Sequence, residues 1–304
     1  MSTPTRLRSD PARARAYGAW IVVCLVWGTT YLAIRIALET MPPMLMAGIR
    51  WVSAGILLLA GLAVRRIPLP PLSSWPALAL IGGLMTSIGN GAVVWAEQTV
   101  PSGLAALLVA AVPFWMVGVE RLMPDHEPVT LLRIAGLLVG FSGIVLLVGP
   151  DLFQRTGNSI LAGAAATQLA CIGWSIGSSY SRRRHTNENV IASAAIQMLF
   201  GGGLLLIAGG VLGEWPALSL NSRTLIATTY LVLAGSIAAF TAYLYALRHL
   251  PVATVSMYAY INPVIAVALG TAILGEPFSP RLAVAGAVVL VGMMMVRRSQ
   301  ARPT

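Results

Sequence analysis

Two ionisable residues, Arg50 and Glu97, lie within or at the end of long apolar segments of the sequence. An ionisable group in apolar surroundings is costly, so it usually marks a pathway for a polar solute or an internal pair. A guanidinium binds a carboxylate through two parallel hydrogen bonds. We expect Arg50 to do this with a bound solute and to pair with Glu97, with Arg35 nearby. The opposing interpretation is structural: Arg50 ties helices together, while Arg35 and Glu97 extend toward water.

Uncharged polar side chains also fall in or near the apolar segments. They are Asn90, Gln98, Gln168, Gln197 and Asn262. Between membrane helices such groups form hydrogen bonds worth about 0.6–2 kcal/mol, so tying helices together is their ordinary role. Asn90 and Asn262 are our candidates for lining a cavity. Asn262 precedes Pro263, and a proline frees a backbone carbonyl nearby.

Aromatic residues are a third group of candidates. Trp27 and Trp174 lie near the middle of their segments, away from the interface where Trp and Tyr gather in membrane proteins. We predict that both line one cavity, and we include Tyr31 and Tyr258 among the residues that bind a substrate there. Core packing is the alternative for the two tryptophans, and a place in the interfacial aromatic belt is the alternative for aromatic residues near segment ends.

The sequence shows no arrangement typical of an enzyme. No paired carboxylates, histidine cluster, glycine-rich phosphate loop or Ser-His-Asp set occurs in the apolar segments. Cys24 and Cys171 lie inside such segments and are expected to be buried as small apolar side chains. We therefore expect no catalytic residues, no metal and no cofactor. Without an ATP-binding module, this chain alone does not carry out ATP-driven transport.

The composition places most of the chain in lipid. Of its 304 residues, 57% are hydrophobic and 10% are charged, whereas a soluble domain has about 25% charged residues. The formal charge of +10 raises the possibility of a nucleic-acid partner. That possibility weakens because the basic residues, all arginines, sit mostly in short links between apolar segments, where orientation in a membrane requires them.

Crossing a bilayer takes about 20 apolar residues, and the chain divides into ten such segments. They cover residues 17–37, 44–64, 75–96, 99–119, 129–149, 159–180, 190–212, 224–247, 251–274 and 280–296. The first is too long for a signal peptide and is expected to be retained. At Pro101 and Pro251 the alternative is one long kinked helix. Pro113 and Pro263 are predicted kinks that let the fourth and ninth helices act as gates.

The arginines predict how the segments are oriented. Alternate links and the two tails carry Arg6, Arg8, Arg13, Arg15, Arg65, Arg66, Arg121, Arg133, Arg182, Arg183, Arg184, Arg248, Arg297, Arg298 and Arg302. The opposite links carry only Arg155, Arg223 and Arg281. Because cytoplasmic links are rich in arginine and lysine, we expect a multi-pass protein of a bacterial inner membrane with both termini in the cytoplasm.

The two halves of the sequence resemble each other. Cys24-Leu25-Val26-Trp27 corresponds to Cys171-Ile172-Gly173-Trp174, Arg35 corresponds to Arg182, and Pro113 corresponds to Pro263. We predict an Arg-rich tail at 1–16, a first repeat at 17–150, a second at 159–297 and a tail at 298–304. Because five is odd, a second five-helix unit enters the membrane in the opposite direction. Inverted repeats of this kind are common in secondary transporters, with the substrate site between the halves.

Several motifs resemble the EamA family of the drug/metabolite transporter superfamily. They are Val26-Trp27-Gly28-Thr29-Thr30-Tyr31, Ala47-Gly48-Ile49-Arg50, Val100-Pro101-Ser102-Gly103-Leu104-Ala105-Ala106 and Tyr260-Ile261-Asn262-Pro263 with Gly275-Glu276-Pro277. The Gly-Asn-Gly at 89–91 followed by Ala96-Glu97-Gln98 is most similar to YedA-type members. The first half has Val119-Glu120-Arg121 where the second has Leu274-Gly275-Glu276, a departure from the pattern. The resemblance implies a ten-helix exporter or facilitator of small metabolites.

Together these observations predict an all-α membrane protein of ten transmembrane helices in two inverted five-helix repeats. Its expected function is secondary transport, exporting amino acids, drugs or related amphipathic compounds by alternating access. The expected partners are a small-molecule substrate and the lipid bilayer, with a proton or counter-substrate for coupling; Glu97 is the nearest candidate for a proton carrier. The alternatives are a flippase for lipid-linked carriers and, less favoured, a membrane enzyme.

Overall fold

The computed structural model describes residues 11–123, 130–148, 157–184 and 187–300. Every regular element in these ranges is a helix, which confirms the expected all-α class for this part of the chain. The predicted tails before Pro11 and after Gln300 lie outside the described residues, as does Arg155 in the link between the halves.

The helices follow one another with short connections. In the first half they are α1 (Pro11–Ala37), α2 (Pro43–Val64), η1 (Leu72–Ser74), α3 (Trp75–Gly82), η2 (Gly83–Gly91), α4 (Ala92–Ala96), α5 (Ser102–Val109), α6 (Val112–Leu122) and α7 (Leu131–Val148). In the second half they are α8 (Gly157–Arg183), α9 (Val190–Val211), η4 (Trp215–Ala217), α10 (Ser222–Tyr230), η5 (Leu231–Ala238), α11 (Ala239–His249), α12 (Val252–Val255), α13 (Tyr258–Leu274) and α14 (Pro280–Gln300).

Seven helical runs among the described residues are long and apolar enough to cross a membrane. They are Ala12–Ala37, Pro43–Val64, Leu72–Ala96, Ser102–Leu122, Ser159–Arg183, Val190–Val211 and Ser222–His249. Three shorter apolar helices cover Ile134–Gly143, Ile261–Leu274 and Pro280–Gly292. The number of ten crossings therefore stays a prediction. The divisions at Pro101 and Pro251 are confirmed, because one helix ends before each proline and the next begins directly after it.

Two segments are broken close to the predicted kinks. Pro113 is the second residue of α6, and the chain leaves the helix between α5 and α6, at residues 110–111. Proline has no N–H to donate to the carbonyl four residues earlier, here that of Val109. The Sγ of Cys171 lies 3.9 Å from this oxygen and from that of Leu108, so α8 supplies a donor to the break. Pro263 lies inside α13, which begins after a similar break at residues 256–257.

The third and eighth predicted segments each change from α-helix to π-helix in their middle. The π-helices are η2 (Gly83–Gly91) and η5 (Leu231–Ala238). A π-helix bonds each residue to the fifth one along, so it rotates the side chains that follow relative to a continuous α-helix, and it is frequent at functional sites. The two π-helices occupy corresponding places in the two halves, which extends the sequence repeat to the backbone.

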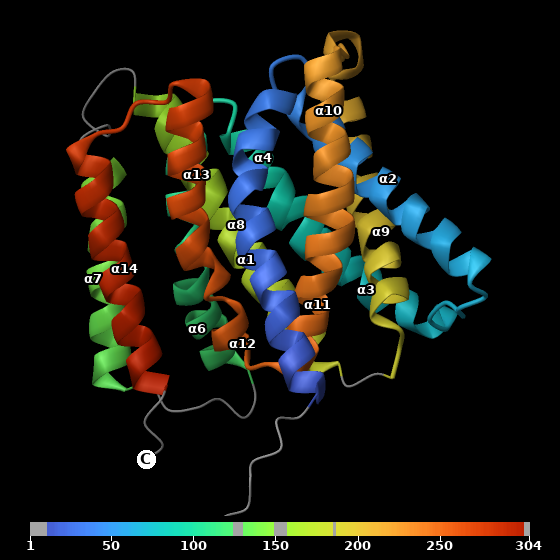
Figure 1. The fold of residues 1–304 in the computed structure, drawn as a ribbon, viewed down its shortest axis with the longest axis horizontal. Helices are drawn as coiled ribbons and strands as arrows, with labels where there is room; N and C mark the ends of the chain where they lie inside the picture. Colours follow the sequence, from blue (N-terminus) through green and yellow to red (C-terminus); the bar gives the residue numbers. More distant parts are fainter. Residues whose placement is uncertain (1–10, 124–129, 149–156, 185–186, 301–304) are drawn as a thin grey trace, which may run out of the picture.

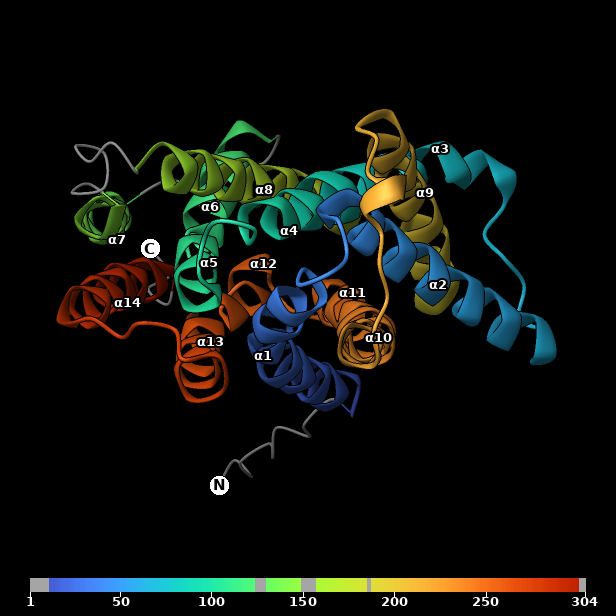
Figure 2. The ribbon, with the colours of Figure 1, turned by 90° about the horizontal axis from the view of Figure 1, so that it is seen from above.

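The two halves pack against each other along their whole length. Close pairs join α2 with α9, α7 with α14, and α1 with both α11 and α13. Seen from above in Figure 2, α8, α3 and α4 lie along one side. Helices α14, α13, α1 and α10 lie along the other side, with α5 and α12 between. The centre of the molecule is therefore an interface between halves. Figure 1 also shows that α1 begins and α14 ends at the same face.

Glycines allow the closest approaches between helices. A Cβ on Gly82 would lie 2.2 Å from the Gln197 carbonyl oxygen, and one on Gly201 would lie 1.7 Å from Thr86 Oγ1. A Cβ on Gly292 would lie 2.3 Å from the backbone nitrogen of Gly140. Small residues at such crossings are typical of helix packing in membranes.

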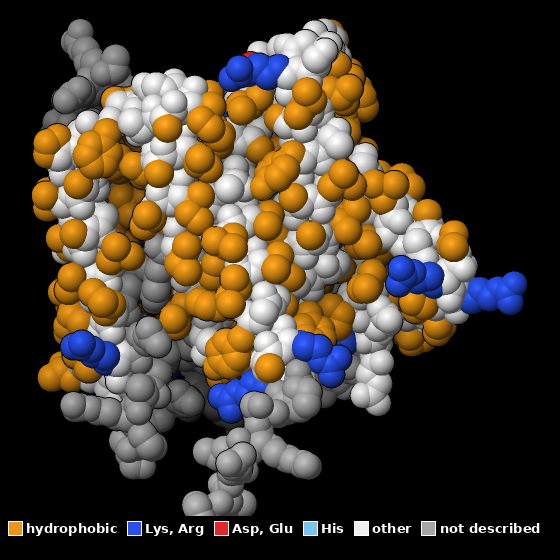
Figure 3. Space-filling view, in the orientation of Figure 1, with side chains coloured by type: hydrophobic (Ala, Val, Ile, Leu, Met, Phe, Trp, Pro, Cys, Tyr) orange, Lys and Arg blue, Asp and Glu red, His pale blue; other side chains and the backbone are white. Residues whose placement is uncertain are grey.

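The outer surface of the helices is apolar. Figure 3 shows hydrophobic side chains spread over the visible face, while the basic side chains lie at its edges: at the lower end, where α1 begins and α14 ends, at the right, where α2 ends, and at the top. Large exposed apolar residues include Leu25, Leu138, Ile226 and Val264. In water such a surface marks an interaction site. On helices of this length and hydropathy it is the surface that lipid covers.

Candidate functional site

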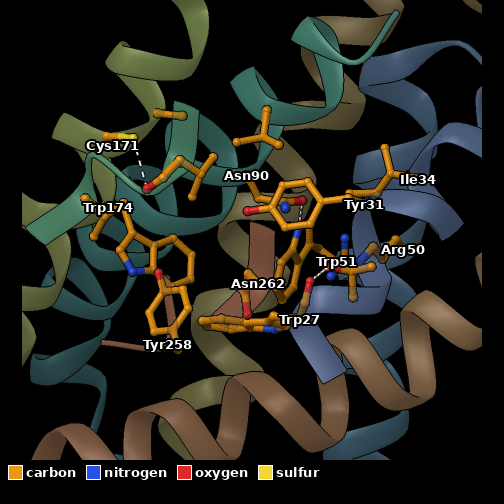
Figure 4. A pocket seen from close by; sticks show the side chains of 16 residues that line it. Trp27, Tyr31, Ile34, Arg50, Trp51, Asn90, Cys171, Trp174, Tyr258 and Asn262 are labelled. Atoms are coloured by element: carbon orange, nitrogen blue, oxygen red, sulfur yellow. Dashed lines mark hydrogen bonds between the residues drawn. The ribbon is translucent and has the colours of Figure 1, made fainter. Parts of the chain in front are cut away.

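A cavity lies between the two halves, near the middle of the long helices (Figure 4). All seven residues predicted to bind a substrate line it: Trp27, Tyr31, Arg50, Asn90, Trp174, Tyr258 and Asn262. They come from α1, α2, η2, α8 and α13, so both halves contribute. The cavity volume is about 60 Å³, room for a few water molecules. The structure brings these residues together; their binding of a substrate stays a prediction.

Aromatic rings form one side of the cavity. Trp27 and Trp174, the pair related by the sequence repeat, meet edge to face with centroids 5.2 Å apart. Tyr258 meets Trp27 in the same way at 4.9 Å, and Tyr243 lies 5.1 Å from Trp27 and 5.2 Å from Trp174. Edge-to-face contacts bring the positive edge of one ring to the negative face of another. The two tryptophans therefore line the cavity as adjoining walls, in contact with each other.

Hydrogen bonds fix these rings. Trp27 Nε1 donates to the Gly235 carbonyl oxygen at 3.0 Å, in π-helix η5. Trp174 Nε1 donates to Tyr243 Oη at 3.1 Å, and this hydroxyl lies 2.8 Å from Ser178 Oγ. Each indole N–H is thus paired, as burial requires.

Arg50 is held at its base and unpaired at its end. The side chain is buried, with an exposed fraction of 2%. Its Nε donates to Ser236 Oγ at 2.8 Å, and its Cζ lies 4.7 Å from the centroid of the Trp51 ring. Its Nη1 has no hydrogen-bond partner among the described residues. A guanidinium stacked on an aromatic face gains cation–π stabilisation, while the unpaired nitrogen leaves a donor for a ligand in the cavity that Arg50 lines.

The predicted ion pair between Arg50 and Glu97 is not formed in this structure. Neither oxygen of the buried Glu97 carboxyl has a hydrogen-bond partner among the described residues. Arg50 is held by Ser236 on η5. Arg35 Nη1 donates to the main-chain carbonyls of Glu97 and, at 3.1 Å, Gln98. Arg35, which the sequence analysis placed near the Glu97 carboxylate, therefore binds main-chain carbonyls at the end of α4 instead of that carboxylate.

The two asparagines both line the cavity and tie helices together. Asn90 Oδ1 accepts from Trp51 Nε1 at 2.8 Å, which joins η2 to α2. In the amide orientation that satisfies its surroundings, Asn262 Nδ2 donates to the Cys24 and Tyr258 carbonyls, each at 3.1 Å. The helix-tying role considered for these residues is thus present alongside their place in the cavity wall.

The predicted kink residues lie beside the cavity and not in its lining. Val109 and Val112, on either side of the break before Pro113, line it, as does Asn262 directly before Pro263. Sequence analysis did not select Trp51, Ser236 or Gly235 as site residues. Trp51 follows Arg50 directly, which could have marked it. Ser236 and Gly235 had no such signal, because their direction depends on the π-helix.

Within the described residues, no three His, Cys, Asp or Glu side chains lie close enough together to hold a metal ion. Cys24 and Cys171 are both buried free thiols. The groups that the cavity lining offers to a solute are a guanidinium, aromatic rings, two phenols and two amides.

Comparison with known proteins gives a consistent result. Residues 15–149 and 161–298 each match the model of the EamA-like transporter family. The chain is 40% identical over 281 residues to the uncharacterized inner membrane transporter YedA of Escherichia coli (strain K12), covering 92% of this chain and 90% of that one. It is 24% identical over 286 residues to a probable amino-acid metabolite efflux pump of Salmonella typhimurium, covering 91% and 92%. A crystal structure with 22% identity superposes with a TM-score of 0.70, covering 96% of this chain and 99% of that one, and shows the same fold.

Proposed function

Because the chain belongs to the EamA-like transporter family, we propose that it is a secondary transporter that exports small carboxylate-bearing metabolites across the inner membrane. Membership of the family makes it a membrane transporter; the direction, the substrate and the mechanism are the proposal. The observation that carries the proposal is the unpaired Nη1 of the buried Arg50 in a cavity between the two halves. Inverted-repeat transporters bind substrates at this interface.

The cavity chemistry supports an amphipathic substrate. Arg50 offers a charge-assisted hydrogen bond, which is about twice as strong as a neutral one. Trp27, Trp174 and Tyr258 offer apolar ring surface beside it. A molecule with a carboxylate and an apolar or aromatic side group satisfies both, and amino acids belong to this class. A cavity of about 60 Å³ is too small for such a molecule, so binding requires the helices to move apart.

Two matched arginines support alternating access as the mechanism. Arg35, in the last turn of α1, donates to the Glu97 and Gln98 carbonyls at the end of the third segment. Arg182, in the last turn of α8, donates to the Leu247 carbonyl at 3.1 Å and to that of Leu250, at the end of the eighth. Helix α1 ends at one face of the molecule and α8 at the other (Figure 1). Each arginine thus closes one end of the path.

The two arginine contacts lie within one half each, whereas a further contact at each end joins the two halves. At the Arg35 end, the Glu276 carboxylate accepts from the Ser102 and Gly103 backbone N–H groups at 2.9 and 3.3 Å. At the Arg182 end, Arg183 and Glu120 form a two-pronged ion pair at 2.8 and 2.9 Å. We propose that the inverted repeats comprise residues 17–150 and 159–297, with both termini in the cytoplasm, so that Arg35 closes the outer end and Arg182 the inner end.

The experiment is export from cells that overexpress the protein. Cells are loaded with a labelled panel of amino acids, their amides and amines of matched shape, and efflux is compared with that of an Arg50→Ala strain at equal membrane protein level. We expect efflux of one or more carboxylates, none of the matched amide, and loss with Arg50→Ala. Equal efflux of acid and amide, or undiminished efflux by the variant, contradicts the proposal. Loss of the variant from the membrane supports the helix-tying role of Arg50, and Arg50→Lys then provides the comparison of acid with amide.

A further inference from the structure

A second hollow, separate from the central cavity, lies on the outside of the helices. It has a volume of about 540 Å³ and runs between α13 and α14, against α5. Figure 3 shows the surface hollowed between these two helices, on the apolar face. The lining is Leu107, Ala110, Pro263, Val264, Val267, Ala268, Thr271, Ala272, Phe278, Leu282, Ala283, Gly286, Ala287, Val289 and Leu290. Threonine is its one polar residue, so we call it the apolar groove.

The length of the apolar groove matches one leaflet of a bilayer. On α13 its lining runs from Pro263 to Ala272, and on α14 from Leu282 to Leu290. At 1.5 Å per helical residue these stretches are about 12–14 Å long. The hydrocarbon core of a bilayer is about 30 Å thick, so each leaflet supplies about half of that. A single lipid chain that ends in mid-membrane therefore fits the groove along its length.

One end of the apolar groove is polar. A smaller pocket, whose lining includes Glu276, Ser279 and Arg281, shares Val267, Thr271 and Leu282 with it. Glu276 is already bonded to the N-terminus of α5, where the helix dipole favours a negative charge. The hollow as a whole is therefore amphipathic: apolar from mid-membrane outward and polar where α13 ends and α14 begins. That order of polarity is the order in a phospholipid, from chain end to headgroup.

The groove and the central cavity share a wall. Ala110 and Pro263 face the groove, while their chain neighbours Val109 and Asn262 face the cavity. The shared wall therefore consists of the break before Pro113 and the helix around Pro263. These segments have incomplete helical hydrogen bonding. A molecule that fills the groove therefore packs against them and limits how far they move.

We propose that the apolar groove binds one acyl chain of a phospholipid from the leaflet on the Glu276 side, and that this chain braces the wall of the cavity. This goes beyond the proposed transport function, since the groove is occupied whatever the substrate is. The bilayer is as apolar as the groove, so packing contacts and not the hydrophobic effect decide which chain stays. The chain remains bound longer than lipid on the open helix faces.

The first test uses the unaltered protein in vesicles of phosphatidylethanolamine whose second acyl chain carries a diazirine. After illumination, labelled peptides are identified by mass spectrometry. We expect labelling to concentrate on residues 263–272 and 282–290, several-fold above equally apolar exposed positions such as Leu25 and Ile226. Labelling spread evenly over all exposed apolar positions overturns the proposal.

The second test fills the groove. Ala283→Trp places an indole in it, while Val284→Trp places the same side chain next along α14 at a position that is 54% exposed and outside the groove. We expect Ala283→Trp to lower the diazirine labelling of residues 263–272 about tenfold, because the site no longer admits a chain, and Val284→Trp to leave it unchanged. Equal labelling in the two variants overturns the proposal. If Ala283→Trp does not fold, the labelling pattern of the unaltered protein decides.

Discussion

The two halves of the molecule share a mechanical framework and differ in chemistry. Trp27 and Trp174, Arg35 and Arg182, and the π-helices η2 and η5 occupy corresponding places. At other positions that correspond in the repeat, the residues differ: Arg50 corresponds to Gln197, Tyr31 to Ser178 and Glu97 to Leu247. The residues that are the same in both halves form hydrogen bonds between helices, whereas most of the cavity's polar groups come from the first half. In the proposed mechanism the shared framework serves the movement, and we expect the differences between the halves to decide which substrate is bound.

The largest expected difference is between Arg50 and Gln197. Both are buried to 2% exposure, and each has one polar atom without a hydrogen-bond partner in the described chain. A hydrogen bond to a charged group is worth about 1.5–3 kcal/mol, or roughly 10- to 100-fold in affinity. We expect Arg50→Ala to lower substrate uptake into proteoliposomes by about this factor and Gln197→Ala to change it little. Arg50→Lys should recover part of the uptake, because it keeps the charge and loses the planar fork.

The control for this comparison is the amount and melting temperature of each variant in detergent. Equal losses for Arg50→Ala and Gln197→Ala would mean that the two halves contribute alike, and the division between framework and chemistry would be wrong.

The second difference is between Glu97 and Leu247, whose carbonyls accept hydrogen bonds from Arg35 and Arg182 respectively. Only the first half has a carboxyl here, and it is buried without a partner. If it carries the coupling proton, Glu97→Gln removes the response to a pH gradient and leaves binding intact. A gradient of one pH unit drives about tenfold accumulation of substrate per proton exchanged. In vesicles one pH unit more acidic inside, Glu97→Gln should therefore accumulate about tenfold less substrate than the unaltered protein.

Leu247→Gln is the matched variant and should keep the full pH response, measured with the membrane potential clamped. If uptake by Glu97→Gln still follows the pH gradient, Glu97 is not the proton carrier and coupling depends on a counter-substrate.

A smaller effect tests the matched arginines themselves. Cys171 lines the cavity, so with Cys24 replaced by Ser it reports access from either side. Arg35→Ala should raise its reaction with an impermeant thiol reagent from outside, and Arg182→Ala from inside. A hydrogen bond to a charged group is worth about 1.5–3 kcal/mol, so removing one shifts the equilibrium between conformations by up to roughly 10- to 100-fold. We expect the lower end, because Glu276 and the Arg183–Glu120 pair still hold the two ends.

Right-side-out and inside-out vesicles provide the two directions of access. Increased labelling from the same side in both variants would contradict the assignment of the two arginines to opposite ends.

The sequence predicted which residues line the cavity better than it predicted their hydrogen-bond partners. Polar and aromatic residues in the middle of apolar segments, taken with the repeat, led to Trp27, Arg50 and Trp174, and these converge in space. The predicted pairing of Arg50 with Glu97 is not formed in this structure, where Arg50 Nε donates to Ser236. That serine lies in a π-helix, whose extra residue per turn changes which side chains face the cavity. Helical periodicity in a sequence assumes a uniform α-helix, so it does not locate such a residue.

The smallest expected effect concerns the matched tryptophans, which the framework treats as equivalent. Their hydrogen bonds differ: Trp27 donates to the Gly235 carbonyl of η5, whereas Trp174 donates to a tyrosine hydroxyl that also contacts Ser178. Phenylalanine keeps most of the ring contacts and removes only the indole N–H. Trp27→Phe leaves the Gly235 oxygen without that donor, while after Trp174→Phe the Tyr243 hydroxyl keeps a partner.

Interhelical hydrogen bonds in membranes average about 0.6 kcal/mol, with values up to about 1.7 kcal/mol. Trp27→Phe should therefore lower thermal stability in detergent measurably, and Trp174→Phe should lower it less. Trp75→Phe is the control, since Trp75 donates to Pro70 within its own link, away from the cavity. A larger loss for Trp174→Phe would mean that the tyrosine network, and not the anchoring of η5, holds the aromatic cluster. The second half would then carry more of the site's energetics than its lack of charge suggests.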